Sequence, residues 1–234
     1  MYQKWKDLLF VHWEFDPAVI QKTLPHGLTV DTFEGKAYLG VVPFFMCDIR
    51  PRCCPAIPGI SNFLEMNVRT YVFDDRGTPG VWFYSLDANQ RLVVRTARRF
   101  FHLPYFDATI RATKKDGISY ECRRRNSIDS SCFEYRATGE LERPTPDSLE
   151  FFLVERYLLF AHDRKRDKLY SGRVHHSPYP LRRVEFEIKQ EAAIGQSGFD
   201  PPDRAPDHAV MSHGVDVDIF AIRALNSSAN ISHP

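Results

Sequence analysis

The sequence predicts an α+β protein in which most of the chain forms a large, mostly antiparallel sheet. Ten or so segments carry the alternating or wholly apolar pattern of strands, and most are separated by short turns such as Lys115-Asp116-Gly117. Only two or three segments have helical spacing. Closure of such a sheet would remove its exposed edges, so we expect a closed or partly open β-barrel with two or three flanking helices.

The chain shows no internal repeat and no point at which its composition shifts sharply. Its 234 residues are 43% hydrophobic and 13% aromatic, which is enough for one sizeable core. We therefore expect a single domain over residues 1–225. The polar segment 226–234 is expected to be a disordered tail.

Strand patterns dominate the first 87 residues. Asp16-Pro17 supplies the cap and the first-turn proline that begin a short helix at about 17–24. Segment 50–62 holds three prolines and no periodicity, so we expect a loop that is either a lid over a pocket or a packed surface loop. The strands are expected at 7–15, at 28–33 and 36–46 as a hairpin, and in a second hairpin over 63–87.

Two longer helices are expected in the remainder of the chain. Asp87 would cap a helix at about 88–101, and a second helix would span about 147–161. Arg156 falls within the apolar stripe of this second helix and would need a carboxylate or carbonyl partner. The remaining strands are expected at about 105–114, 117–125, 131–141, 168–176 and 182–190, followed by a last pair of strands over about 208–221.

Charge and composition argue against several classes of function. The formal net charge is +1, from 31 basic and 30 acidic residues, so neither nucleic acid nor a membrane surface is an expected partner. No apolar run reaches about 18 residues and no export signal is visible, so we expect a cytoplasmic protein. The five cysteines lack CxxC spacing, and only the vicinal pair Cys53-Cys54 invites a redox or metal role. We expect no cofactor and no metal.

The most unusual polar pattern lies in segment 63–87. Four polar or charged side chains occupy alternate positions and would share one face of a strand: Glu65, Asn67, Arg69 and Tyr71. The next strand is rich in aromatic residues, which suggests that its neighbour is central in the sheet. The polar face would then line an interior cavity, and the alternative is an ordinary solvated face.

A cavity with this lining would suit a small organic acid or carbonyl compound. Arg69 would bind a carboxylate, and Asn67 and Tyr71 would orient the ligand. Glu65, paired with Arg69, is the candidate for proton transfer, although a purely structural ion pair would give the same pattern. The expected aromatic walls are Trp82, Tyr84 and Tyr105.

An interaction protein is the alternative hypothesis. Four arginines on the helix 88–101 could dock an acidic partner, or they could form a solvated face whose stems cover apolar surface: Arg91, Arg95, Arg98 and Arg99. A homodimer is the default expectation for oligomeric state, because two-fold assemblies are the commonest.

Several segments resemble the uncharacterised DUF2071 (YqjF-like) family of the acetoacetate decarboxylase-like superfamily. The resemblance covers about residues 5–220. It rests on LLFVHWEF (8–15), LPHGLTVDTFEGKAYLGVVPF (24–44), NVRTYV (67–72), GVWFYSLDAN (80–89), ARRFFHLPY (97–105), ERYLLF (155–160) and LYSGRVHHSPYPL (169–181). It implies a cone-like antiparallel barrel with an internal pocket, and it likens Glu65 to the pocket glutamate of the decarboxylases.

The resemblance also implies a departure in chemistry. Decarboxylases of the superfamily use a lysine that forms a Schiff base, activated by a neighbouring lysine. The corresponding stretch here is Leu103-Pro104-Tyr105-Phe106, which has neither lysine. The nearby Lys114-Lys115 pair falls in an expected turn. Whether the protein is an enzyme stays open: acid/base chemistry without a Schiff base and a lyase with a relocated lysine are both retained.

Overall fold

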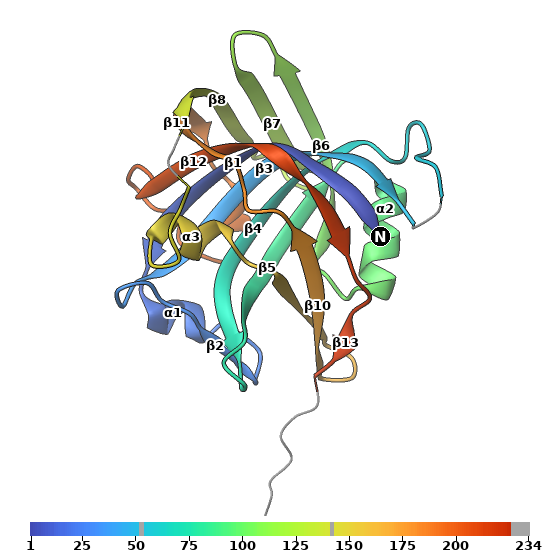
Figure 1. Cartoon of the computed structure of the whole chain (residues 1–234), viewed down its shortest axis with the longest axis vertical. Coiled ribbons are helices and arrows are strands. Elements are labelled where there is room, and N and C mark those ends of the chain that lie inside the picture. Colours follow the sequence, from blue (N-terminus) through green and yellow to red (C-terminus); the bar gives the residue numbers. More distant parts are fainter. Residues whose placement is uncertain (52–53, 141–142, 226–234) are drawn as a thin grey trace, which may run out of the picture.

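The computed structural model describes residues 1–51, 54–140 and 143–225. Residues 226–234 and Cys53 of the vicinal pair therefore lie outside the described residues. Strands make up most of the described chain, with short helices at the periphery (Figure 1). The helices are α1 (Pro17–Gln21), α2 (Arg91–Phe100), α3 (Leu149–Val154) and α4 (Ala193–Gln196). No helix within the described ranges is long and apolar enough to span a membrane.

The strands form one sheet. They are β1 (Tyr2–Phe15), β2 (Leu28–Val30), β3 (Ala37–Arg50), β4 (Phe63–Asp74), β5 (Pro79–Ala88), β6 (Tyr105–Lys114), β7 (Ile118–Arg124), β8 (Ser131–Glu140), β9 (Leu158–Asp163), β10 (Lys168–His176), β11 (Leu181–Gln190), β12 (His208–Ile219) and β13 (Arg223–Ala224). Their order is β13-β10-β9-β5-β6-β7-β8-β11-β12-β1-β3-β4-β2. Most neighbours are antiparallel, and β5 pairs in parallel with both β6 and β9.

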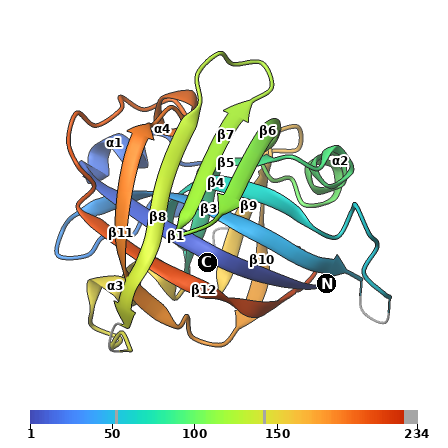
Figure 2. The same ribbon diagram turned by 90° about the horizontal axis from the view of Figure 1, so that it is seen from above.

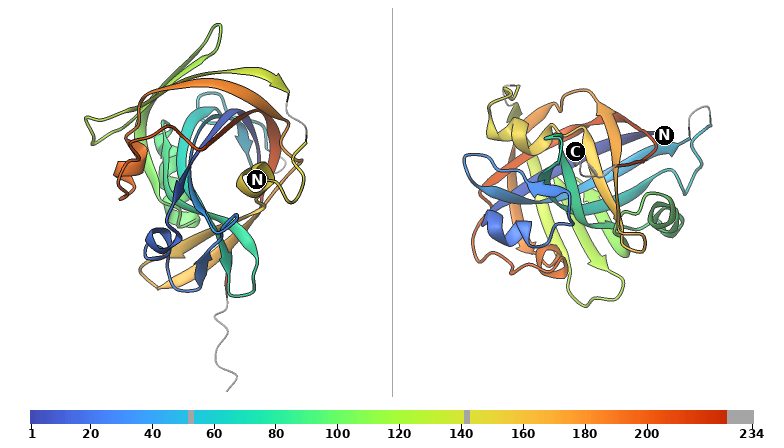
Figure 3. Two further views of the ribbon diagram at one scale, coloured as in Figure 1. Left: turned by 90° about the vertical axis from the view of Figure 1, so that its left-hand side faces the viewer. Right: turned by 90° about the horizontal axis from the view of Figure 1, so that it is seen from below.

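Two further pairings close this sheet on itself. β4 pairs with β5, and β10 pairs with β12. One closed path runs through β5, β6, β7, β8, β11, β12, β1, β3 and β4, and a second runs through β5, β9, β10, β12, β1, β3 and β4. Strands β12, β1, β3, β4 and β5 belong to both paths and form a wall between two interiors. The curvature of the ribbons is visible in Figures 2 and 3.

Side-chain alternation places two different cores on the two sides of this wall. On β1, Leu8 and Phe10 join one cluster of buried residues, whereas Leu9 and Val11 join the other. Successive strand residues point to opposite faces, so each central strand supplies both cores and reads as a continuous apolar run. The first cluster packs against α2 and α3, and it contains the cavity described below.

Three sequence-based expectations are wrong in their details. The helix expected at 147–161 ends at Val154, and the chain then forms strand β9. The hairpin expected over 28–46 forms only at its turn, where Phe33 and Lys36 make one antiparallel bridge; the strand before it, β2, pairs with β4 instead of β3. Asp87 lies within β5 and pairs with Arg124, so Gln90 caps α2.

Candidate functional site

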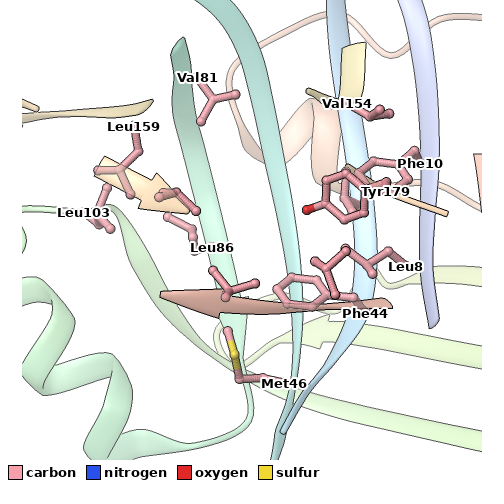
Figure 4. Packing of buried hydrophobic residues seen from close by; sticks show 14 of the residues in the cluster. Leu8, Phe10, Phe44, Met46, Val81, Leu86, Leu103, Val154, Leu159 and Tyr179 are labelled. Carbon is pink, nitrogen blue, oxygen red and sulfur yellow. The ribbon is translucent and has the colours of Figure 1, made fainter. Parts of the chain in front are cut away.

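A cavity of about 310 Å³ lies on the α2 side of the shared wall. Its lining is predominantly apolar and comes from β1, β3, β5, α2, β9 and β10, among others. Figure 4 shows Leu8, Phe44 and Tyr179 on one side of this region and Leu103, Val81 and Leu159 on the other. A cavity with apolar walls and a few polar groups is typical of small-molecule sites.

The polar groups of the cavity come chiefly from one face of β4. Glu65, Asn67 and Arg69 all line it. The alternate residues Met66 and Val68 face the second core instead. β4 is flanked by β3 and β5, so it is a central strand and its odd-numbered side chains are enclosed. Tyr71, the fourth member of the row, is fully buried beyond the lining residues.

Arg69 is a buried cation without an anionic partner among the described residues. Its side chain is 7% exposed, and its Nη2 donates to the carbonyl oxygen of Leu153 at 3.0 Å. The guanidinium lies 5.3 Å from the ring centroid of Phe10 and 5.6 Å from that of Tyr71. Nε has no hydrogen-bond partner within the described part of the chain. A buried charge is costly unless it is paired, so this group is well placed to bind an anion.

Glu65 does not form the ion pair with Arg69 that we expected. Its Oε2 accepts a hydrogen bond from Tyr105 Oη at 3.0 Å, and no ion pair with Arg69 is found among the described residues. Glu65 and Arg69 are four residues apart on β4, so their Cα atoms are separated by about 13 Å. Side chains that leave the strand in the same direction cannot form a direct ion pair over that distance. Glu65 and Arg69 therefore mark two separate polar points of the cavity.

The environment of Glu65 favours its neutral form. The pKa of this carboxyl is raised to about 8, chiefly by burial; the hydrogen bond from Tyr105 lowers it in part, and the nearby Asp87 contributes to the rise. Tyr120 holds the backbone at this point, because its Oη donates to the Glu65 carbonyl at 2.8 Å. A neutral carboxylic acid at pH 7 can donate a proton to a bound ligand.

Three lining side chains carry buried polar atoms without a hydrogen-bond partner among the described residues. They are Trp5 Nε1, Asn67 Oδ1 and Arg69 Nε. Buried polar atoms in proteins are nearly always hydrogen-bonded, and each exception calls for an explanation. Here the three atoms are grouped around one cavity, so a ligand that enters it can satisfy them.

A chain of hydrogen bonds lies behind Arg69 and fixes Tyr71. Tyr71 Oη is 2.7 Å from His12 Nε2, and His12 Nδ1 is 3.1 Å from His208 Nδ1. Burial lowers the pKa of both imidazoles, so both are neutral near pH 7. Gly40 makes room for this arrangement, because a Cβ there would lie 2.8 Å from His12 Cδ2. The ring of Tyr71 is thus held in place beside the guanidinium of Arg69.

The aromatic walls differ from those expected. Tyr105 lines the cavity, whereas Trp82 and Tyr84 do not. Tyr84 packs on Phe199 at a centroid distance of 4.8 Å, on the side of the second core. Trp82 packs in a small separate cluster near Phe160. The aromatic residue that β5 contributes to the wall is Phe83, which sequence reasoning missed; Val81 and Leu86 of the same strand also line the cavity.

A β-bulge explains this correction. Val68 pairs with Ser85 and Arg69 pairs with Phe83, so Tyr84 has no partner on β4. The extra residue reverses the alternation of β5, which places Phe83 and Leu86 on the same side although they differ in parity. No turn signal or glycine in the sequence marks this position.

The described lining residues include no lysine. Tyr105, which follows Pro104, contributes a phenol to the cavity where the resemblance would have placed an amine. Lys114 and Lys115 are exposed at the end of β6, and Lys114 forms an ion pair with Asp7. Among the residues with described positions, no group of three or more His, Cys, Asp or Glu side chains is arranged to hold a metal ion.

Solved structures with the same architecture are acetoacetate decarboxylase-like proteins. An acetoacetate decarboxylase-like enzyme from Sphingomonas wittichii RW1 is 14% identical, with a TM-score of 0.66 over 97% of this chain and 93% of that one. The acetoacetate decarboxylase of Legionella pneumophila is 12% identical, with a TM-score of 0.65 and coverage of 97% and 88%. The enduracididine biosynthesis enzyme MppR, solved in complex with pyruvate, is 13% identical, with a TM-score of 0.66 and coverage of 97% and 91%. The fold is therefore that of the acetoacetate decarboxylase-like proteins.

Sequence similarity is more specific. The model of the family DUF2071, described as an uncharacterized conserved protein, matches residues 2–216. The uncharacterized protein YqjF of Bacillus subtilis (strain 168) is 39% identical over 208 residues, which cover 88% of this chain and 85% of YqjF. The chain belongs to the DUF2071 family, as the sequence motifs implied.

Proposed function

We propose that this protein is a barrel-like binding protein or enzyme that takes a small organic acid or carbonyl compound into the cavity beside Arg69. The observation that carries the proposal is the buried guanidinium of Arg69, which has no anionic partner among the described residues and faces a cavity with predominantly apolar walls. A carboxylate there would supply the missing counter-charge and a bidentate set of acceptors. The complex of the structural neighbour MppR with pyruvate supports the same ligand class.

The chemistry that fits this cavity does not pass through a Schiff base. A Schiff base needs an amine at the ligand. The described lining offers no lysine, and its one amine, the N-terminal group of Met1, donates a hydrogen bond to the Ile219 carbonyl at 2.6 Å. Glu65 is the group suited to proton transfer, because burial keeps it protonated near pH 7. Asn67 would orient the ligand, Tyr105 would hold Glu65, and Tyr71 would act through Arg69. We place the protein in the cytoplasm and expect a homodimer, as ordinary defaults.

A thermal-shift titration tests this proposal. Pyruvate, acetoacetate and related oxo and hydroxy acids are added to the full chain, and the wild type is compared with Arg69→Met. A ligand at 100 times its dissociation constant adds about 2.7 kcal/mol to the free energy of unfolding. For a chain of this length, the melting temperature then rises by about 5–11 °C. The rise should vanish in Arg69→Met.

A matched arginine variant provides the control. Arg95 is exposed on the opposite side of α2 and does not line the cavity. Arg95→Met should keep the full shift if the acid binds beside Arg69. A shift that disappears in Arg95→Met and persists in Arg69→Met would refute the proposal and favour the arginine-rich helix as the anion site.

The alternative function is docking through α2. Its exposed arginines share a surface depression with basic residues of the β9–β10 turn, and Phe100 beside them is 63% exposed. An acidic protein partner would fit this surface by charge. The charge-reversal variants Arg95→Glu and Arg99→Glu should then abolish capture of the partner without changing any acid-induced thermal shift.

A further inference from the structure

The cavity is longer than a three-carbon oxo acid requires. Glu65 lies opposite Ala88, at the end of β5 that leads into α2, whereas Arg69 lies opposite Phe83, well inside the sheet. At about 3.3 Å per residue, their Cα atoms are about 13 Å apart along β4. The cavity volume of about 310 Å³ falls within the range of sites that hold drug-sized ligands.

The two ends of the cavity differ in chemistry. The Arg69 end has the guanidinium, the side chain of Asn67 and the neighbouring carbonyl of Leu153. The end near α2 is lined mainly by apolar side chains from α2 and β3, among them Val93, Ala97, Phe101, Met46 and Ile49. It is not sealed, because Leu92 there is 52% exposed, and Trp5 and Arg50 also line it. A ligand that fills this space must therefore have an anionic head and an apolar body.

We propose that the ligand class is an elongated monocarboxylic acid whose carboxylate pairs with Arg69 and whose apolar chain runs along β4 to the α2 end of the cavity. This inference rests on the proposed function and specifies its substrate class. An extended chain of C–C bonds of about 1.5 Å advances about 1.3 Å per carbon, so about eight to ten carbons span the distance from Arg69 to Glu65. The Glu65 carboxyl then lies beside the distal part of the chain, and the carbonyl or hydroxyl of a functionalised chain would meet it there.

Chain length should set the affinity. Burial of one methylene contributes about 0.8 kcal/mol, which corresponds to about a fourfold gain in affinity. An acid that stops near Asn67 leaves the apolar end unfilled and forgoes this gain. Affinity should therefore rise about fourfold with each methylene and level off once the chain reaches the α2 end.

Isothermal titration with unbranched monocarboxylates of three to twelve carbons tests the inference, with each acid kept below its aggregation concentration. The expected result is a stepwise gain that levels off at about ten carbons. Two comparisons identify the two ends. Octanol lacks the carboxylate and should bind more weakly than octanoate, and this difference should disappear in Arg69→Met. Ala97→Phe should shorten the preferred chain, because its ring occupies the apolar end, while binding of propionate stays unchanged.

The outcomes separate this inference from the proposed function. If short and long acids bind equally well and all depend on Arg69, the elongated ligand is refuted and the proposed function stands. If no acid binds at any length, both are refuted. If octanol and octanoate bind alike in the wild type and in Arg69→Met, the cavity takes an apolar ligand without a carboxylate, and both are again refuted. A length-dependent gain that persists in Ala97→Phe would refute the assigned direction of the chain.

Discussion

Replacing Glu65 by glutamine should remove a pH dependence of stability that the cavity imposes. The folded protein holds the pKa of Glu65 at about 8, against an ordinary value of 4.5, because the carboxyl is buried. Between these two values the folded state keeps its proton and the unfolded chain has released it. Stability attributable to Glu65 is therefore fully present below pH 4.5 and decreases as the pH rises to about 8. The slope is about 1.4 kcal/mol per pH unit.

The expected change in the free energy of unfolding follows from the pH interval between the two pKa values. Between pH 5 and pH 8, the free energy of unfolding of the wild type should fall by about 3 to 4 kcal/mol relative to that of Glu65→Gln. Glutamine preserves the size of the protonated carboxyl and can still accept the hydrogen bond from Tyr105. Urea unfolding monitored by tryptophan fluorescence at pH 5, 6.5 and 8 measures this difference.

A second glutamine variant provides the control. Glu121 is an exposed carboxylate on β7, and Glu121→Gln should follow the wild type at every pH. The reasoning about the site is refuted if the difference between the wild type and Glu65→Gln stays constant from pH 5 to pH 8. A constant difference would mean that Glu65 titrates alike in the folded and unfolded chain, which excludes it as a neutral proton donor near pH 7.

Two further substitutions test packing and ion-pair contacts around the site. Gly40→Ala should cost about 1–3 kcal/mol in urea unfolding, because the new Cβ would overlap His12, whereas Gly139→Ala, with open space around it, should cost less than about 1 kcal/mol. Arg124→Met should cost about 3–5 kcal/mol at pH 7, since it leaves the buried Asp87 without its two hydrogen bonds of 2.9 and 3.1 Å. A loss of stability below about 1 kcal/mol in Gly40→Ala or in Arg124→Met would contradict the contacts described for that residue.

The polar face of β4 could be recognised from the sequence because alternation is a local property. Glu65, Asn67 and Arg69 are two residues apart, and a regular strand puts such residues on one face regardless of its partners. Whether that face was interior depended on the neighbours, and the aromatic composition of the following segment indicated that correctly. Their role in ligand binding stays a prediction.

The errors arose where distant pairing overrode local pattern. Both faces of β5 are apolar, so the sequence pattern does not indicate the bulge at Tyr84. Because of this one extra residue, Phe83 lines the cavity in place of Trp82 and Tyr84. The segment after Val154 has helical spacing, but parallel pairing of Val81 with Leu159 fixes it as a strand. A pairing across about 80 residues has no signal in a local window.

The prediction for Arg156 shows that a physical requirement can survive a wrong assignment of secondary structure. The residue was placed on a helix that ends before it, yet its expected need for a carboxylate or carbonyl partner is confirmed. Nη1 donates to Asp31 Oδ2 at 2.7 Å, and Nε donates to the Phe152 carbonyl at 2.8 Å. The cost of burying a charge is the same in any backbone conformation.

The same requirement distinguishes the two buried arginines of the cavity. Arg156 and Arg69 both line it, and both lie over the ring of Tyr71, at 5.3 and 5.6 Å. Arg156 has a carboxylate, Asp31, whereas Arg69 has only the carbonyl of Leu153 and an unpaired Nε among the described residues. If both guanidiniums served only to hold the wall together, both would be expected to have a counter-charge. This difference is why we propose Arg69, and not Arg156, as the group that binds the anion of a ligand, since an added carboxylate would remove the larger electrostatic cost there.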